Sequence, residues 1–140
     1  MQKVWLHLAT LFAVGLAGCG GGPGDEVKRV VVSGKVIKGG QPLSKGRITL
    51  YPIAGTKAPT SGAEIKDGAY LIDAKGGVPV GTHRVEVHEF EVKQNIPGRP
   101  AALDVENNIL PEKYNSKSKL EIKVDAGEPI VKDIDLDKDF

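Results

Sequence analysis

The sequence predicts an all-β fold, a seven-stranded antiparallel sandwich of two sheets, preceded by an N-terminal export segment. Apolar runs after residue 26 are short and alternate with polar residues at a period of two, which is typical of half-buried strands. Glycine and proline separate these runs at short intervals. No window of eleven or more residues in this part sustains a 3.6-residue period, so no helix is expected there. Short alternating strands bury their apolar faces most economically in two packed sheets.

The first 18 residues have the three parts of an export signal. Lys3 gives a basic start, residues 4–16 are apolar, and Ala17 and Gly18 are small. The apolar stretch is about a dozen residues, too short for the roughly 20 that a membrane-spanning helix needs. The segment ends at Cys19, the only cysteine of the chain.

The run Leu16-Ala17-Gly18-Cys19 resembles the bacterial lipoprotein signal. The resemblance implies a signal peptide over residues 1–18, cleavage before Cys19, and diacylglycerol bound to the Cys19 sulfur. Residues 19–26 are then a lipidated, glycine-rich tether to a bacterial membrane of the cell envelope, and Gly20 favours the outer membrane. An ordinary secretory signal with a chance cysteine, or a buried cysteine, is the alternative. A stretch as rich in glycine as residues 20–24 has no side chains to place in a core.

The remaining chain, residues 19–140, has the size of one domain. Its acidic and basic residues balance, so charge gives no argument for nucleic acid as a partner. Trp5 and Met1 both lie in the export segment, so the core must be built from Val, Ile and Leu. With a single cysteine, no disulfide within the chain is possible.

The predicted strands begin with residues 27–37, where valines at positions 30, 32 and 36 share one face. Gly39-Gly40 then supplies a tight turn. The next strand covers residues 47–52 and ends at Pro52, because proline has no ladder donor. Lys66-Asp67-Gly68 forms a hairpin turn between two further strands. These two strands span residues 61–65 and 69–73.

Residues 82–92 form the longest predicted strand, and the irregular region 93–118 that follows contains three prolines. Residues 120–124 and 130–136 supply a last hairpin, joined through residues 125–129. The sandwich domain therefore covers residues 27–140.

Several segments resemble the carboxypeptidase regulatory-like domains, which share a transthyretin-like, immunoglobulin-like sandwich. These segments are Val32-Ser33-Gly34-Lys35-Val36, Gly39-Gly40-Gln41-Pro42-Leu43, residues 46–50, Asp67-Gly68-Ala69-Tyr70 and residues 78–87. Leu110-Pro111-Glu112-Lys113-Tyr114-Asn115 resembles a segment common in lipoproteins of planctomycete bacteria. The resemblance spans roughly residues 30–136 and implies a non-catalytic accessory module. His83 departs from it, since the family usually has an aromatic residue there.

Two residue patterns resemble metal sites, but each lacks a feature that such a site requires. His83 and Glu86 have the His-x-x-Glu spacing of zinc carboxypeptidases, but residues three apart on a strand point to opposite faces, and His88 fails for the same reason. We expect His83 to face solvent or lie at a rim. Alternating aspartates at positions 133, 135, 137 and 139 resemble the start of a calcium loop, but Lys138 stands where glycine is required. We expect these carboxylates on the solvent side, with Ile134 and Leu136 inward. No metal or other cofactor is predicted.

Nucleophilic catalysis has no support in the motifs. No serine lies in a Gly-x-Ser-x-Gly elbow. The transthyretin-like hydroxyisourate hydrolase carries a C-terminal Tyr-Arg-Gly-Ser signature, which Asp137-Lys138-Asp139-Phe140 replaces here, and fold alone does not transfer function. A small envelope hydrolase or metal-dependent enzyme using His83 or His88 remains the alternative function.

The function we expect is that of a lipid-tethered, non-catalytic binding or structural module that contacts an envelope protein or polysaccharide. Long loops are often functional, so the 93–118 region is the candidate contact surface. Its polar candidates are Asn95, Arg99, Asn107, Asn108 and Lys113. Alternatively this region caps the sandwich, with Ile109, Leu110 and Tyr114 docked on it. Pairing of an exposed edge strand with a partner is another route.

Overall fold

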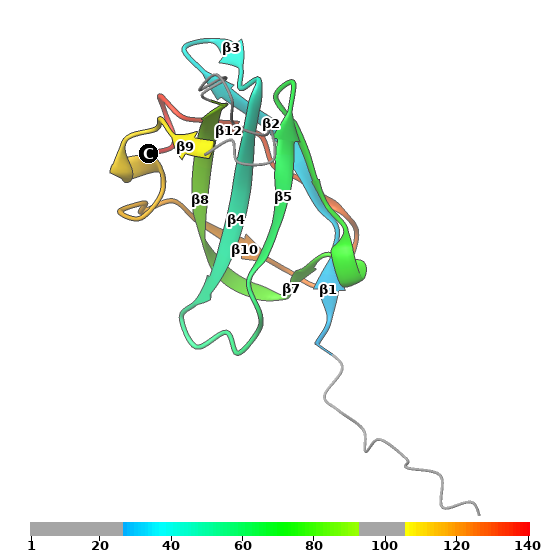
Figure 1. Ribbon diagram of the computed structural model, residues 1–140. Helices are drawn as coiled ribbons and strands as arrows, with labels where there is room; N and C mark the ends of the chain where they lie inside the picture. The colour runs from blue at the N-terminus through cyan, green and yellow to red at the C-terminus, as the bar shows by residue number, and fades with distance from the viewer. Residues whose placement is uncertain (1–26, 93–105) are drawn as a thin grey trace, which may run out of the picture.

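The computed structural model describes residues 27–92 and 106–140, whose regular structure is almost entirely β-strand (Figure 1). The described residues contain no α-helix, only the 3-10 turns η1 (Ala74–Gly76) and η3 (Glu112–Tyr114). The strands are β1 (Arg29–Val30), β2 (Val32–Lys38), β3 (Gln41–Pro42), β4 (Lys45–Ile53), β5 (Ser61–Lys66), β6 (Ala69–Ile72), β7 (Val78–Pro79), β8 (Gly81–Val92), β9 (Glu106–Asn108), β10 (Glu121–Val124), β11 (Ile130–Val131) and β12 (Ile134–Asp135). The all-β, sandwich-like class is confirmed.

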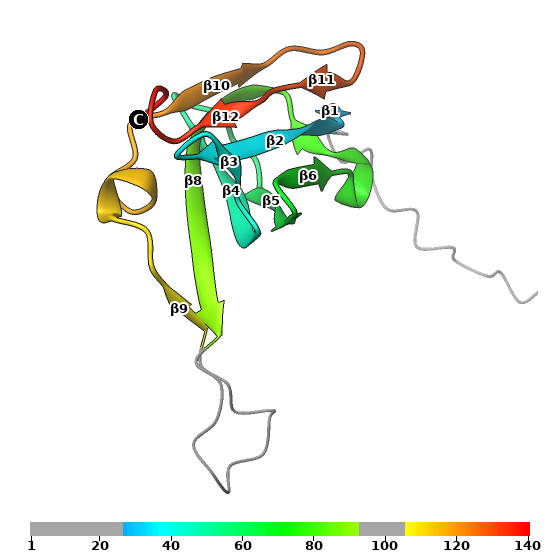
Figure 2. The ribbon, with the colours of Figure 1, turned by 90° about the horizontal axis from the view of Figure 1, so that it is seen from above.

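One large sheet and one small sheet make up the domain. The large sheet runs in the order β10-β8-β4-β5-β6-β2-β11, with β3 and β12 beside β2 and β9 beside β8, and β1 pairs with β7 in the small sheet. Viewed from above, the large sheet curls, so that β2, β11 and β12 lie across the core from β4 and β8 (Figure 2). Each of the seven predicted strands falls on this main path.

The core lies inside the curl and is built from aliphatic side chains, as the composition predicted. Its buried members are Val30, Val32, Val36, Leu43, Ile48, Leu50, Ile65, Tyr70, Ile72, Val78, Val85, Val87, Leu110, Val124, Ile134 and Leu136. Among the described residues, these buried side chains all fall between residues 30 and 136, so residues 27–140 contain a buried apolar core. Burial of this apolar surface is the main term that stabilises the fold.

The two tight turns follow from residues that tolerate positive φ. Gly39 and Gly40 have φ of 59° and 73° between β2 and β3, and Asp67 and Gly68 have φ of 50° and 79° between β5 and β6. Positive φ at both central positions is the type I′ geometry that matches the twist of hairpin strands. Both turns were predicted from the sequence and are confirmed.

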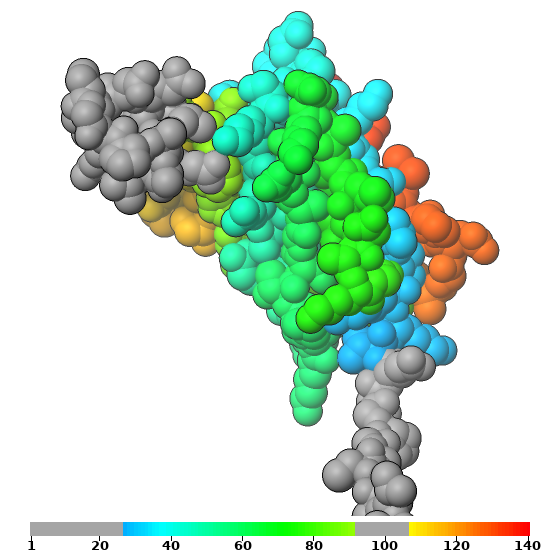
Figure 3. Space-filling view, turned by 45° about the vertical axis from the view of Figure 1, so that its right-hand side comes forward, coloured from blue at the N-terminus to red at the C-terminus, as the bar shows by residue number. Residues whose placement is uncertain are grey.

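The predicted last hairpin is wrong. β10 pairs antiparallel with β8, whereas β11 and β12 both pair parallel with β2, at the other end of the sheet order. The connection over residues 125–129 therefore carries the chain between the two ends of the curled sheet (Figure 2). In the space-filling view its residues, coloured orange, stand out from the side of the molecule (Figure 3).

Three boundaries also differ from the prediction. The first strand is divided at Val31 into β1 and β2, and β4 continues through Pro52 to Ile53. The 93–118 region is not wholly irregular, because residues 106–108 form β9 beside the end of β8. Short pieces of this kind carry little alternation of their own, so period-two patterning does not reveal them.

Candidate functional site

His83 lies inside the core, on β8, which corrects the expectation of a rim position. Its side chain is fully buried, on the same face as Val85 and Val87, opposite Pro52 of β4 and Ile122 of β10. Nδ1 lies 3.2 Å from the carbonyl oxygen of Gly81, and Nε2 has no hydrogen-bond partner. Burial lowers the pKa of His83, and the contact with the Gly81 carbonyl opposes that shift.

Arg84, Glu86 and His88 lie on the opposite face of β8 from His83. Glu86 is buried there beside Arg84, whose Nη1 is 2.7 Å from Glu86 Oε1 and whose guanidinium lies 5.1 Å from the Tyr51 ring centroid. His88 stacks on Phe90 of the same strand at 6.1 Å between ring centroids. His83 therefore converges with neither Glu86 nor His88. Among residues 27–92 and 106–140, no group of three or more His, Cys, Asp or Glu side chains could hold a metal ion.

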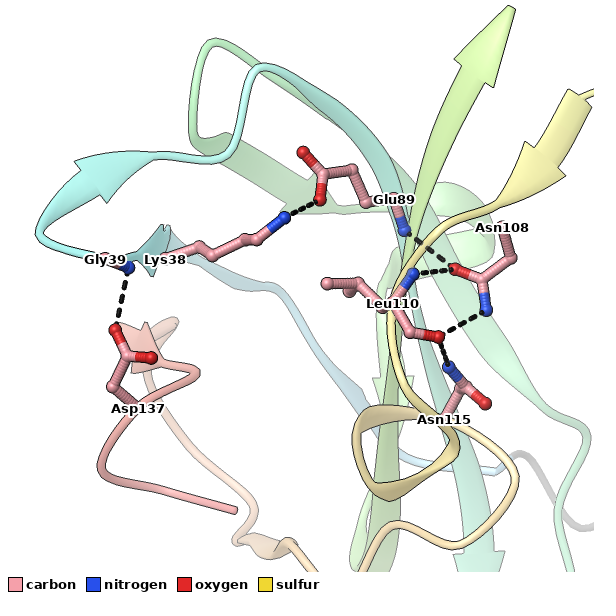
Figure 4. A network of polar contacts seen from close by, with 7 residues as sticks. All are labelled: Lys38, Gly39, Glu89, Asn108, Leu110, Asn115 and Asp137. Atoms are coloured by element: carbon pink, nitrogen blue, oxygen red, sulfur yellow. Dashed lines mark hydrogen bonds and ion pairs between the residues drawn. The ribbon is translucent and has the colours of Figure 1, made fainter.

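The segment after β9 is held in place by two asparagines (Figure 4). The Asn108 side-chain oxygen accepts hydrogen bonds from the backbone N–H groups of Glu89 and Leu110, at 3.3 and 3.2 Å. Asn115 is buried, and its Nδ2 donates to the carbonyl oxygens of Leu110 and Pro111 at 3.3 and 3.1 Å. These amides therefore satisfy backbone groups of their own loop and of β8.

The same segment docks on the sandwich through part of the expected set of apolar residues. Leu110 is buried, and the Tyr114 ring packs edge-on against the C-terminal Phe140 at 5.3 Å between centroids. Ile109 is half exposed. Ser118 donates a short hydrogen bond to the carbonyl of Val85 and closes this segment onto β8. The expected capping role is thus present for Leu110 and Tyr114 and not for Ile109.

The structure describes only some of the candidate contact residues, and these have different surroundings. Asn95 and Arg99 lie outside the described residues. Asn107 is half-buried in β9 opposite Glu91, and the Lys113 ammonium lies 4.4 Å from the Tyr114 ring centroid. The sequence interpretation missed Asn115, although it ends the Leu110–Asn115 segment that the sequence had already singled out.

The C-terminal aspartates do more than face solvent. Ile134 and Leu136 point inward as predicted, but Asp133 Oδ1 accepts the backbone N–H of Lys35 at 2.8 Å. Asp137 Oδ2 accepts that of Gly39 at 2.7 Å, close to where Lys38 forms an ion pair with Glu89 (Figure 4). These carboxylates satisfy backbone donors of β2 and of the turn that follows it.

Comparisons of this chain with protein-family models, with curated proteins and with solved structures find no match. In the described part of the chain, no helix has the length and apolar character needed to cross a membrane. Cys19, the predicted lipid attachment point, lies outside the described residues. A functional conclusion must therefore be drawn from the sequence motif and the geometry of the domain.

Proposed function

We propose that this chain is a lipid-anchored protein of the bacterial cell envelope, and that its β-domain is a non-catalytic binding or structural module. The observation that carries the proposal is Leu16-Ala17-Gly18-Cys19 at the end of an apolar run. Diacylglycerol on Cys19 supplies two acyl chains, and two chains anchor a protein stably where a single chain is marginal.

The geometry of the domain supports a tethered module with two distinct ends. The backbone N–H of Val80 donates to the carbonyl of Lys28 at 2.9 Å, so the described chain begins beside the start of β8. β8 then runs for 12 residues, about 36 Å between its ends at about 3.3 Å per residue, and its last three residues pair with β9. The β8–β9 end therefore lies far from β1, near which the described chain begins (Figure 1).

The tether of residues 19–26 is short, reaching at most about 27 Å when fully extended. It would hold the β1 end near the lipid surface and present the β8–β9 end to the surrounding envelope. A protein or polysaccharide of the envelope would then meet residues 93–118, including Asn95, Arg99 and Lys113. Asn108 would not contact the partner directly but would hold the backbone of this region in place. Its side-chain oxygen already accepts hydrogen bonds from the N–H groups of Glu89 and Leu110.

Mass spectrometry of the mature N-terminus tests the anchor. We expect a chain that begins at Cys19 and carries the mass of a diacylglyceryl group, and we expect it in the membrane fraction. Cys19→Ser is the matched control, since it removes the sulfur that forms the thioether and leaves the β-domain unchanged. An unmodified Cys19, cleavage at another site, or membrane retention of Cys19→Ser would refute the proposal.

A further inference from the structure

β10 presents a free edge. It stands at the end of the large sheet, and β8 is its only strand partner among the described residues. The Val85 N–H donates to the Leu120 carbonyl at 2.8 Å, so residues 120, 122 and 124 direct their backbone groups toward β8. Because backbone direction alternates, Glu121 and Lys123 direct their N–H and C=O groups away from the sheet. These are the groups with which another strand could pair.

A groove of about 280 Å³ runs beside this edge, with Ile130 and Lys132 on its other side. Glu121 and Lys123 are exposed, and Ile122 and Val124 face the core. The run from residue 119 to 125 contains no proline, which would have removed a backbone donor and blocked pairing. The edge is therefore not blocked by proline, and charged side chains flank it.

The charges along this edge are self-complementary. Lys119, Glu121, Lys123 and Asp125 are all exposed and occupy alternate positions, on one face of the strand. When two copies run antiparallel with Ile122 opposite Ile122, Glu121 of each copy faces Lys123 of the other, and Lys119 faces Asp125. The two-fold axis makes four opposite-charge pairs. In this arrangement Glu121 and Lys123 are also the residues whose free backbone groups meet.

The charge order selects a single register. A shift of two residues keeps the faces and the free backbone groups aligned, so neighbouring registers differ only in their side-chain pairs. Centring the pair on Glu121 places Glu121 against Glu121 and Lys119 against Lys123. Centring it on Lys123 places Lys123 against Lys123 and Glu121 against Asp125. Both alternatives oppose like charges, which destabilises cross-strand pairing.

We propose that the partner of this edge is a second copy of the chain, joined by antiparallel pairing of β10 with β10 about a two-fold axis at Ile122. The interface is isologous, so the same residues serve both copies. Dimerisation replaces the ion pair between Lys123 and Asp125 of one chain, whose charged atoms lie 2.9 Å apart, with pairs between the two copies. That ion pair is largely exposed, so it contributes little to stability by itself. The proposal does not depend on the lipid anchor.

Charge reversal tests the pairing in the domain of residues 27–140, which carries its own core and lacks Cys19. Sedimentation equilibrium should show a monomer–dimer equilibrium. Lys123→Glu and Glu121→Lys should each weaken the dimer by about ten- to hundredfold, because each turns two attractive pairs into repulsive ones. The double variant should restore dimerisation to within about threefold, since it exchanges the two charges and keeps them opposite. A wild-type domain that is monomeric at its highest soluble concentration, or a dimer insensitive to these changes, would overturn the proposal.

Disulfide cross-linking tests the register. Ile122 and its copy form a non-hydrogen-bonded pair, with Cβ atoms about 4.5–5.5 Å apart, so Ile122→Cys should cross-link on oxidation after a small adjustment. Lys119→Cys is the matched control, because residue 119 and its copy lie six residues apart along the strands, roughly 20 Å. Cross-linking of Lys119→Cys in preference to Ile122→Cys would contradict the register. Neither result changes with the fate of Cys19, so failure here and failure of the lipid anchor are distinguishable.

Discussion

His83 is an unusual core residue, because it places an ionisable ring among aliphatic side chains. Its Nε2 is the only buried side-chain nitrogen or oxygen in residues 27–92 and 106–140 that has no hydrogen-bond partner. Leaving such an atom unsatisfied costs about 1–3 kcal/mol. The charged neighbours Arg84 and Glu86 lie on the opposite face of β8 and pair with each other, so they do not compensate a proton on His83.

Protonation of His83 should therefore destabilise the fold. Burial lowers its pKa below the value of about 6.5 that it takes in the unfolded chain, so the unfolded state binds the proton more readily. Its contribution to stability is complete above pH 6.5 and is lost as the pH falls toward the folded-state pKa, by up to about 1.4 kcal/mol per pH unit. Urea unfolding of residues 27–140, followed by circular dichroism between pH 7.5 and 5, measures this loss.

The variant His83→Phe should remove that part of the pH dependence, because phenylalanine fills the position without a titratable atom. His88→Gln is the matched control, because it removes an imidazole from the opposite face of the same strand, where His88 is half-buried. If His83→Phe unfolds with the same pH slope as the wild type, protonation of another group controls acid stability.

Among the elements, Gly34 allows the C-terminal chain to lie close against β2, where β11 and β12 pair parallel with it. A Cβ atom at Gly34 would lie 2.0 Å from the carbonyl oxygen of Lys132, far inside van der Waals contact. That carbonyl is fixed, because it accepts a hydrogen bond from the Tyr70 hydroxyl at 2.5 Å and the backbone N–H of Lys132 donates to the Ser33 carbonyl at 2.7 Å. Burial raises the pKa of Tyr70, so the hydroxyl keeps the proton that it donates.

Gly34→Ala should consequently destabilise the domain by about 3 kcal/mol, because backbone rather than a flexible side chain must move. Urea unfolding measures the change in the free energy of unfolding. Lys35→Ala in the same strand is the matched control, since Lys35 is exposed and its backbone N–H would still donate to Asp133, and we expect a change within about 0.5 kcal/mol. Equal stability of the two variants would show that residues 132–133 can move away from β2.

Strand positions could be predicted because they depend on local alternation, whereas strand partners could not. The residues of β10 and β11 read as a hairpin, yet their five-residue connection has no two-residue turn of the favoured types. The parallel pairing instead depends on contacts about one hundred residues apart in sequence, such as Lys132 with Ser33. The one sign of this pairing in the sequence is Gly34, because glycine permits close approach of another backbone. The sequence does not show which backbone approaches it.

In the candidate site, too, some features could be predicted from the sequence and others could not. The burial of His83 could have been inferred from the phase of its strand, since Val85 and Val87 lie on the same face. The roles of Asn108 and Asn115 could not be inferred in this way. In the sequence, a polar loop residue that binds a partner looks the same as one that binds its own backbone. Their hydrogen bonds to Leu110 are visible only in the folded chain.

At the scale of the whole molecule, the long axis of β8 separates the two ends of the domain. The described chain starts beside Val80, and β9 pairs with the far end of β8 at Phe90, Glu91 and Val92. Anchoring at one end would leave the other available to the envelope. Tethering to a membrane would also raise the effective concentration of neighbouring copies, which favours the β10 pairing.

Replacing residues 93–105 with Asn-Gly should separate folding from binding. The pairs that β9 makes with β8 remain, and a two-residue Asn-Gly turn suits antiparallel strand ends, so we expect the free energy of unfolding to change by no more than about 1 kcal/mol. Circular dichroism during urea unfolding measures this. In pull-downs from the envelope, the replaced chain should lose the partners that the wild type retains, while Glu91→Ala, in β8 opposite Asn107, controls for damage to the hairpin. Partners retained in full would place the contact surface elsewhere on the domain, and a large loss of stability would make residues 93–105 part of the fold itself.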